Sequence, residues 1–348
     1  MSIVVSAEKQ VQTMRVPLFV GNGEIKYGEK EIPVPGKGQL LLQVKGNALC
    51  GSERGQFYKG TRTTPGHEAA GIVAEVGKET RTLVGAHGVV FLMGYCGECR
   101  SCKLGFTNQC LHKHADYGFN HDGGYGPYMV VNENVFFEID KSIPLIEATM
   151  LLDIMGTGGH AIKRAQLVRT DIQSVIIAGA GPIGLGVLAM VKLLLGKETV
   201  VFIMDFVQYR LDLAEKMGGI AVNLDIGTLE EAISTAGLAG ADVAIDTTGK
   251  TAGRQTAMQA LNKRGVLVCV GHGEELNLKV SSDLIMTERA VLGSEYFQYS
   301  ELEENRKLIM ENIPYLSQII THRYKVEQIQ EAFEIFFQGD TGKVVIEQ

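Results

Sequence analysis

The chain has 348 residues, of which 45% are hydrophobic and 21% are charged, the composition of an ordinary globular protein. A chain of this length can bury two cores, so we expect two folded domains and little disorder. Its 33 basic and 40 acidic residues leave a formal charge of −7, which argues against nucleic acid or an anionic membrane as a partner. The start, MSIVVSAEKQVQTMRVPLF, lacks the pattern of a signal peptide, so we expect a cytoplasmic protein.

The first part of the chain, up to about Asp153, contains short β-like runs such as LLLQVKG, AAGIVAEVG, GVVFLMG and YMVVNENVFFEI, separated by turn residues. Such runs predict a mostly antiparallel, barrel-like β domain. Within this part, Cys50 lies in ALCGSERG, and His67 and Glu68 lie in TPGHEAAG. Taken alone, these residues are ambiguous, because a cysteine is more often a small buried hydrophobe and a histidine beside glycine a turn residue.

Four cysteines, Cys96, Cys99, Cys102 and Cys110, follow with the spacing C-x2-C-x2-C-x7-C. This spacing lets a short loop place four thiolates around one zinc ion, and a closed site of this kind is structural rather than catalytic. A nucleic-acid zinc module is disfavoured, because the lobe carries only scattered basic residues on an acidic chain. An iron–sulfur cluster remains an alternative on spacing alone.

From about residue 156 the pattern changes to alternating strands and helices: SVIIAGA and GPIGLGVLAMVKLLLG, TVVFIMD and VQYRLDLAEKMGG, ADVAIDTTG and a helix through RQTAMQALN, then GVLVCVG and AVLGSEYF. Such alternation predicts a parallel sheet wound with helices on both faces. The last fifty residues, with helical ELEENRKLIMENI and VEQIQEAFEIFFQ and the terminal KVVIEQ, leave this pattern and are expected to return to the first domain.

One uncharged run of eighteen residues, Ser174 to Val191, approaches the length of a membrane span. It is interrupted by four glycines and by Pro182. We therefore expect it to form a short strand followed by a helix, neither of which is long enough to cross a bilayer.

The same run carries Gly179, Gly181 and Gly184 between a strand and an apolar helix, and Asp205 ends the next strand. This context predicts a dinucleotide site in which the helix N-terminus faces the pyrophosphate. A carboxylate at Asp205 would bind the ribose hydroxyls and repel a 2′-phosphate, which favours NAD over NADP. The alternative is that Asp205 only caps a turn.

Taken in order, the segments Cys-Gly-Ser, Gly-His-Glu, the four-cysteine lobe and Gly-x-Gly-x-x-Gly resemble the zinc-containing medium-chain alcohol dehydrogenases, particularly their polyol and threonine dehydrogenase branch. The resemblance runs from PVPGKGQLLLQVKGNALCGSE to GKVVIEQ. It implies a GroES-like catalytic domain of residues 1–155 and 298–348 and a Rossmann NAD-binding domain of residues 156–297. It also implies one catalytic and one structural zinc per subunit.

The resemblance makes Cys50 and His67 ligands of the catalytic zinc, with Glu68 a second-shell carboxylate or an exchangeable ligand. Many relatives have a cysteine ligand four residues before a Thr-Gly pair, and Asp153 holds that place ahead of Thr157. A carboxylate can replace a thiolate on zinc. Whether Asp153 binds directly or through water stays open.

Further roles also come from the resemblance. A zinc with one open position would lower the pKa of a substrate hydroxyl. Ser52 matches the serine that receives the alcohol proton, while Gly55 stands where the family often has the next histidine of the proton path. Thr157 is expected beside the nicotinamide, Arg210 at the adenosine ribose and Lys343 at the pyrophosphate. The remaining residues expected to line the cofactor site are Pro182, Ile183 and Val270.

We therefore expect a cytoplasmic, homo-oligomeric enzyme, a dimer or a tetramer, that transfers hydride between a secondary alcohol and NAD. Glu53, Arg54, Tyr117 and Phe119 hint at a polar pocket for a polyol, a sugar alcohol or a cyclitol. The alternatives are a catalytically silent NAD-binding protein on the same scaffold and a zinc-free quinone reductase-like enzyme, although the latter would have no use for either ligand cluster.

Overall fold

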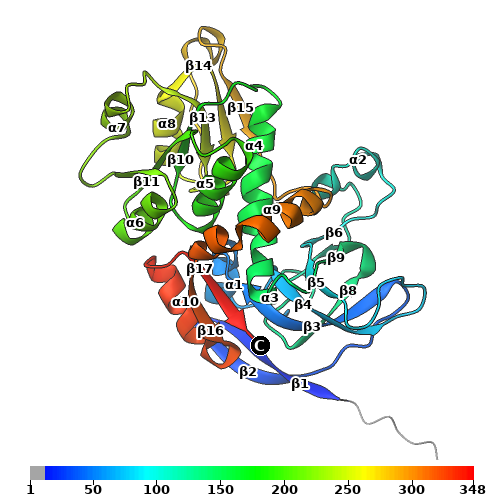
Figure 1. The fold of residues 1–348 in the computed structure, drawn as a ribbon. Helices are drawn as coiled ribbons and strands as arrows, with labels where there is room; N and C mark the ends of the chain where they lie inside the picture. The colour runs from blue at the N-terminus through cyan, green and yellow to red at the C-terminus, as the bar shows by residue number, and fades with distance from the viewer. Residues whose placement is uncertain (1–11) are drawn as a thin grey trace, which may run out of the picture.

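The computed structural model describes residues 12–348, and the first eleven residues, part of the segment without a signal-peptide pattern, lie outside the described part. Two large sheets organise the chain (Figure 1). Seven strands, with β8 beside β3, form one sheet in the order β16-β17-β3-β4-β5-β9, and six form the other in the order β12-β11-β10-β13-β14-β15.

The first sheet and the two small ribbons contain these strands: β1 (Thr13–Gly21), β2 (Glu24–Glu31), β3 (Gln39–Ala48), β4 (Ala69–Val76), β5 (His87–Val90), β6 (Met93–Gly94), β7 (Ala115–Asp116), β8 (Tyr128–Asn132), β9 (Phe136–Glu138), β16 (Ile320–Lys325) and β17 (Lys343–Glu347). The helices of this part are α1 (Arg54–Lys59), α2 (Arg100–Lys103), α3 (Leu145–Ala148), α9 (Glu301–Leu316) and α10 (Ile329–Gln338). Most strand pairs here are antiparallel, as the short alternating runs predict, and β16 with β17 is a parallel pair.

The second sheet is parallel throughout. Its strands are β10 (Ser174–Ala178), β11 (Val200–Asp205), β12 (Ile220–Asn223), β13 (Ala241–Asp246), β14 (Leu261–Cys269) and β15 (Ala290–Gly293), and its helices are α4 (Gly158–Gln166), α5 (Pro182–Leu194), α6 (Gln208–Lys216), α7 (Leu229–Thr235) and α8 (Thr251–Gln259). This is the doubly wound Rossmann arrangement. The sequence analysis did not predict two of its elements, strand β12 and helix α7.

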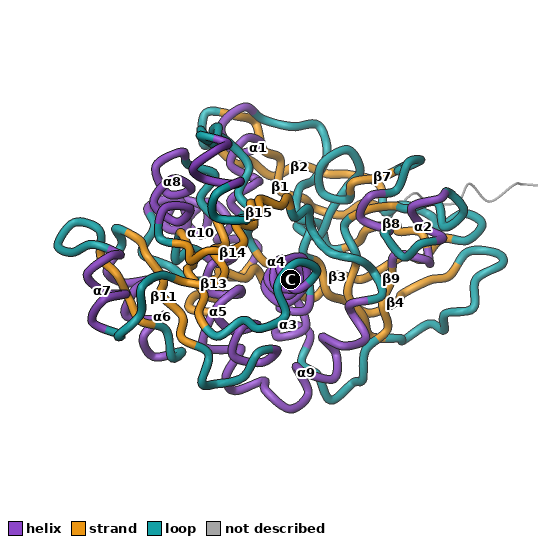
Figure 2. Tube along the Cα trace, turned by 90° about the horizontal axis from the view of Figure 1, so that it is seen from above, coloured by secondary structure: helices purple, strands orange, loops and turns teal. Residues whose placement is uncertain are grey.

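Alternation along each strand explains why helices cover both faces of this sheet. In β10, Val175 and Ile177 belong to the core cluster that contains residues of α4 and α5, whereas Ile176 and Ala178 belong to the cluster that contains residues of α7 and α8. Successive side chains of a strand point to opposite faces, so a fully apolar strand needs a helical layer on each side. Figure 2 shows α5, α6, α7 and α8 around this sheet, while β3, β4, β8 and β9 lie on the other side of the molecule.

The C-terminal segment returns to the first sheet, as expected from the change of pattern after residue 298. Strand β17 pairs with β3 across Val345 and Ala48, and Figure 1 shows the red C-terminal elements beside the blue N-terminal strands. The uncharged run Ser174 to Val191 divides into β10 and α5. Among residues 12–348, no helix combines the length and the apolar character needed to cross a membrane.

Candidate active site

Four side chains that could bind a metal come together from three separate segments. Cys50 directly precedes η1 (Gly51–Glu53), His67 and Glu68 directly precede β4, and Asp153 begins the π-helical turn η5 (Asp153–Thr157). One ligand atom from each of the four lies within 4.8 Å of the others. Zinc bonds of about 2.0–2.3 Å put two ligands of one ion up to about 4.6 Å apart, so the four atoms have nearly the spacing of a single coordination shell.

A buried carboxylate holds His67 in one orientation. His67 Nδ1 donates to Glu53 Oε1 at 3.1 Å, and the hydroxyl of Tyr125 donates to Glu53 Oε2 at 2.7 Å. The other ring nitrogen, Nε2, lies 3.6 Å from Asp153 Oδ2. Burial alone would lower the pKa of His67, but its hydrogen bonds to Asp153, Cys50 and Glu53 raise that pKa well above its ordinary value. Fixing Nδ1 as the donor leaves Nε2 facing the cluster, as metal-binding histidines require.

Lys343 was expected at the pyrophosphate, and the structure places it elsewhere. Its side chain is completely buried, and its ammonium group is hydrogen bonded to Glu68 Oε1. Burial would lower the pKa of Lys343, but the charges of Glu68, Cys50 and Asp153 raise it. An ammonium group can be buried only when it is paired, which explains why this lysine lies beside the acidic cluster and not in the cleft.

The charges of the cluster fit a divalent cation. Cys50, Glu68 and Asp153 are three acidic groups around one ammonium, and Glu68 Oε2 has no hydrogen-bond partner among the described residues. Burial would raise the pKa of Asp153, but His67 and Lys343 lower it to about 2. Burial and the charge of Asp153 raise the pKa of Glu68 to about 8, and burial raises that of the Cys50 thiol. A bound divalent cation would stabilise the ionised forms of both groups, and a mixed sulfur, nitrogen and oxygen donor set suits zinc.

The four-cysteine lobe has the geometry of a closed zinc site. Its sulfur atoms are 3.5 Å apart for Cys99 and Cys102, 3.6 Å for Cys96 and Cys110, and 4.0 Å for Cys96 and Cys102. Sulfurs arranged tetrahedrally around zinc at 2.3 Å are about 3.8 Å apart. Backbone N–H groups of Cys102 and Leu111 point at the Cys99 sulfur and lower the pKa of its thiol to about 6, which favours the thiolate that binds metal.

A cleft of about 820 Å³ begins at the first cluster and extends between the two sheets. The residues that line it include Cys50, Ser52, His67, Asp153, Thr157, Ile183 and Val270. The structure therefore brings three of the four expected metal ligands, the expected proton acceptor Ser52, Thr157 and two expected cofactor-site residues around one space. Other residues lining this cleft were not expected: Leu92, Met93, Lys113, Asp116, Thr247, Thr248, His272, Glu295 and Tyr296.

A second cleft of about 460 Å³ shares Cys50, Arg54 and Ile183 with the first and continues along the glycine turn. Gly179 has φ +93°, a conformation that favours glycine, and a Cβ on Gly184 would lie 1.8 Å from the carbonyl oxygen of Gly179. Helix α5 begins at Pro182 with Gly181 as its N-cap, so its free N–H groups open into this cleft.

Asp205 and Arg210 also line the second cleft. The Asp205 carboxylate accepts hydrogen bonds from the backbone N–H groups of Ala180, Phe206 and Val207. In the structure Asp205 therefore caps a turn, as the alternative interpretation had it. Its binding of the cofactor's ribose hydroxyls stays a prediction. Arg210 Nε donates to the carbonyl oxygen of Thr341.

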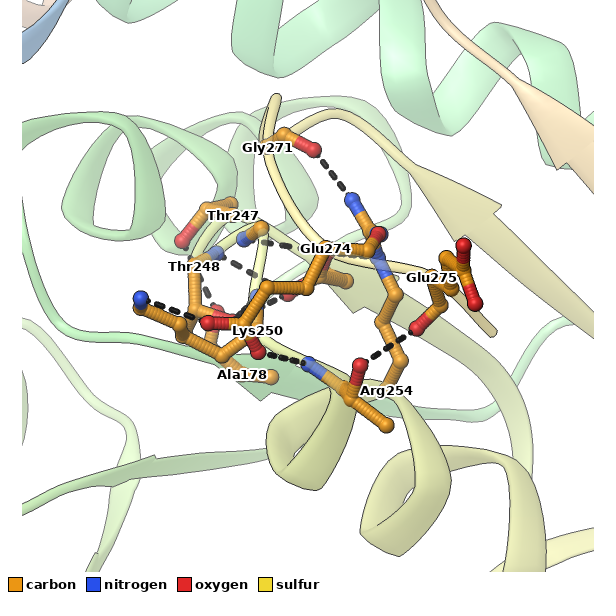
Figure 3. Close-up of polar contacts among 11 residues, drawn as sticks. Ala178, Thr247, Thr248, Lys250, Arg254, Gly271, Glu274 and Glu275 are labelled. Atoms are coloured by element: carbon orange, nitrogen blue, oxygen red, sulfur yellow. Dashed lines mark hydrogen bonds and ion pairs between the residues drawn. The ribbon is translucent and has the colours of Figure 1, made fainter. Parts of the chain in front are cut away.

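Two loops, which contain Thr247 and Gly271, line the first cleft, and the side chain of Arg254 contacts the second of them (Figure 3). Arg254 Nε donates to Asp246 Oδ2 at 2.7 Å, and the rest of its guanidinium group donates to the carbonyl oxygens of Gly271 and Glu274. Thr247 Oγ1 donates to Ala178 O at 2.8 Å, which ties the same loop to the glycine turn. The network thus fixes the positions of Thr247 and of the loop that follows β14 at Gly271.

Two residues proposed for a polar substrate pocket lie elsewhere. Glu53 is completely buried behind His67, and Tyr117 is buried with its hydroxyl accepting a hydrogen bond from Asn132 N. Phe119 does line the cleft and lies against the His67 ring, 5.0 Å between centroids. The position of Glu53, three residues after Cys50, was the one signal in the sequence that could have indicated its support of His67.

Two family models match the chain. Residues 36–141 match the alcohol dehydrogenase GroES-like domain, and residues 155–348 match the glucose dehydrogenase C-terminus. An uncharacterized zinc-type alcohol dehydrogenase-like protein of Escherichia coli is 27% identical over 97% of this chain and 99% of its own length. An L-threonine 3-dehydrogenase of Shewanella frigidimarina is 30% identical over 90% of this chain and 93% of its own length.

Solved structures share the fold. An alcohol dehydrogenase from Escherichia coli, complexed with NADH, has a TM-score of 0.85 and 23% identity and covers 97% of this chain and 99% of its own. A zinc-binding dehydrogenase from Sinorhizobium meliloti, bound to NADP, has a TM-score of 0.84 and 24% identity and covers 97% of this chain and 100% of its own.

Proposed function

The chain belongs to the zinc-containing medium-chain alcohol dehydrogenase family, and we propose that it transfers hydride between a secondary alcohol and NAD. The observation that carries this proposal is the meeting of Cys50, His67, Glu68 and Asp153 at a cleft that continues to the glycine turn. A catalytic metal beside a dinucleotide cleft is what this chemistry requires.

Cys50 and His67 would hold the catalytic zinc together with Asp153, while Glu68 is the alternative third ligand. Bound zinc would supply a Lewis acid that lowers the pKa of the substrate hydroxyl, and bound NAD would supply the hydride acceptor. Glu53 would keep His67 Nε2 directed at the metal site through its hydrogen bond to Nδ1. The four cysteines of the lobe would hold a second, structural zinc.

Ser52 lines the same cleft and would accept the alcohol proton. Because Gly55 replaces the usual histidine, the proton would leave through water or a ribose hydroxyl. Thr157, Ile183 and Val270 would lie against the nicotinamide end of the cofactor, and the N-terminus of α5 would face its pyrophosphate. We further propose that residues 1–155 with 298–348 form the catalytic unit and residues 156–297 the cofactor-binding unit.

NAD is proposed over NADP because Asp205 lines the second cleft; there its charge would repel the 2′-phosphate of a bound NADP. For the alcohol, the proposal is a polyol, a sugar alcohol or a cyclitol. Charged groups line the cleft near the metal ligands, among them Lys113, Asp116 and Glu295, and they suit a substrate with several hydroxyls. L-Threonine is the competing substrate because a relative carries that activity in its name.

The test is a screen of polyols, sugar alcohols, cyclitols and L-threonine with NAD, in which NADH formation is followed by absorbance. A matched variant, Ser52→Ala, should lose most activity on the substrate found while retaining its metal content. If zinc is present only in the four-cysteine lobe and no alcohol yields NADH, the proposal is wrong and the silent NAD-binding alternative is favoured.

A further inference from the structure

A third cavity, of about 460 Å³, lies beside the first cleft. It is lined by Asn108 of the four-cysteine lobe, by His160 and Arg164 of α4, and by residues at the ends of β14 and β15. Ser294 and Glu295 are among the residues that line both spaces. Pockets that bind small molecules have volumes of about 300–1,000 Å³, so this space, the Arg164 cavity, is large enough for a ligand of its own.

Arg164 is a cation of this cavity that lacks a counter-charge. Two acidic side chains of α9 reach α4, and both are engaged by other residues: Glu301 Oε1 lies 2.8 Å from His160 Nδ1, and Glu304 forms an ion pair with Lys163. Among residues 12–348, no carboxylate forms an ion pair with Arg164. A positive charge that borders a cavity and has no counter-charge favours an anionic ligand.

One edge of the Arg164 guanidinium group is already held by the protein. Its Nε donates to the carbonyl oxygen of Gly293 at 3.1 Å, whereas its two Nη groups have no hydrogen-bond partner among the described residues. The Nη groups form a planar fork that matches the two oxygens of a carboxylate. Glu295 lines the same cavity and pairs with His272 at 3.3 Å, and its charge disfavours an anion with two negative charges. A carboxylate therefore fits better than a phosphate.

Two buried polar atoms in the cavity wall have no partner. They are Asn108 Oδ1 and Ser294 Oγ, and their residues are only 7% and 8% exposed. The amide nitrogen of Asn108 is used, since it donates to the carbonyl oxygen of Glu295 at 2.7 Å. A buried polar atom without a partner costs free energy. Hydroxyl groups on a ligand would satisfy both atoms, because a hydroxyl can donate to Asn108 and accept from Ser294.

On these grounds we propose that the Arg164 cavity is a second ligand site, which binds a small hydroxycarboxylate with one negative charge. The Nη groups of Arg164 would donate to the carboxylate oxygens, and the hydroxyls of the ligand would pair with Asn108 and Ser294. This ligand is distinct from the alcohol at the metal site. The inference requires neither bound zinc nor a bound dinucleotide.

The experiment measures binding of D-gluconate, D-sorbitol and inorganic phosphate to the full-length protein by titration calorimetry, without dinucleotide. Gluconate and sorbitol share six carbons and a chain of hydroxyls, and only gluconate carries a carboxylate. Arg164→Ala should weaken gluconate binding by about tenfold to a hundredfold, the range for a lost charge-assisted contact, and leave sorbitol binding unchanged. Lys163→Ala removes the same charge from the preceding residue and should leave gluconate binding within twofold of wild type.

Ser294→Ala is a second variant that does not disturb a contact of the fold. Because its hydroxyl has no partner in the structure, the substitution should not lower the midpoint of thermal unfolding. It should nevertheless weaken gluconate binding by about threefold to tenfold, as for a lost neutral hydrogen bond. This variant decides the question if Arg164→Ala does not fold.

A gluconate affinity within twofold of wild type in Arg164→Ala, or in Ser294→Ala where Arg164→Ala does not fold, overturns the proposal. An equal loss in Lys163→Ala overturns it as well, because the effect would then be one of general charge. Tighter binding of phosphate than of gluconate would reject a carboxylate ligand. Absence of gluconate binding to the wild-type protein would reject the second site and leave the proposed dehydrogenase activity untouched.

Discussion

Two buried carboxylates, Asp153 and Glu68, are the candidates for the third ligand of the proposed catalytic zinc. Asp153 lies 3.6 Å from His67 Nε2, and Glu68 is already engaged by Lys343 through one oxygen. A carboxylate held by an ammonium group is a poorer metal ligand than one facing the metal site directly, so the geometry supports Asp153 over Glu68 as the firm ligand.

We therefore expect Asp153→Asn to lose catalytic zinc and activity together, since a neutral amide is a weak zinc ligand. Asp153→Cys should retain zinc, because it restores the ligand type of many relatives. Metal content after dialysis, measured by elemental analysis, checks both variants. Full zinc in Asp153→Asn together with zinc loss in Glu68→Gln would assign the third position to Glu68.

A second prediction concerns cofactor choice at Asp205. Asp205→Asn removes the charge while keeping one oxygen that can accept the N–H groups of Phe206 and Val207. The ratio of kcat/KM for NAD to that for NADP should fall by about tenfold or more, since a tenfold change needs only about 1.4 kcal/mol. Steady-state kinetics with both cofactors measure this ratio. Asp212→Asn, on the neighbouring helix, should leave it unchanged, and an unchanged ratio in Asp205→Asn would make Asp205 a turn cap only.

Among the secondary-structure elements, the ends of β13 and β14 depend on the ion pair of Asp246 and Arg254. Asp246 is completely buried, and Arg254 is its charge partner as well as the donor to two carbonyl groups of the next loop. The loops also approach closely, since a Cβ on Gly249 would lie 2.0 Å from the carbonyl oxygen of His272.

Arg254→Met should therefore lower the free energy of unfolding by about 3–5 kcal/mol, because it leaves a buried carboxylate without its counter-charge. Urea denaturation followed by circular dichroism measures the change. The control is Arg306→Met, which removes an exposed pair with Glu303 and should cost less than about 1 kcal/mol. Equal effects of the two substitutions would contradict a special role for the buried pair.

At the scale of the whole molecule, the two clusters of possible metal ligands differ in their access to solvent and substrate. The four cysteines form a closed set within one loop, while the Cys50 cluster lines an open cleft and draws its ligands from three segments. A site that faces a cleft exchanges its metal more readily than one that is closed by four protein ligands.

The protein should accordingly contain about two zinc ions per chain, and a chelator should remove one of them first. Loss of the first ion should abolish NADH formation and leave the circular dichroism spectrum intact, whereas loss of the second should also unfold the lobe. Elemental analysis during a timed incubation with chelator follows both steps. Simultaneous release of both ions, or activity that survives the first loss, would contradict the assignment of the open site as catalytic.

The sequence by itself determined the type of fold and the local chemistry. Period-two runs and the strand–glycine turn–helix pattern predicted the two sheets, because these signals depend on neighbouring residues. The four cysteines could be recognised for the same reason, since all four lie within fifteen residues. The short edge strand β12 and the helix α7 that follows it were missed, because the four residues of the strand, IAVN, carry little periodicity. Helix α8 ends three residues before its predicted end, because Leu261 already pairs with Ala241 in the sheet.

Tertiary structure alone decided which side chains face one another across the clefts. Glu53 supports His67 rather than a substrate, Lys343 neutralises Glu68 rather than a phosphate, and Arg164 has no carboxylate partner among the described residues. Lys343 and Glu68 are 275 positions apart in the chain, and no local pattern encodes such a pair. The partner of a buried charge is set by the folded packing of distant segments, because each charge removed from water must find its counter-charge wherever the chain places one.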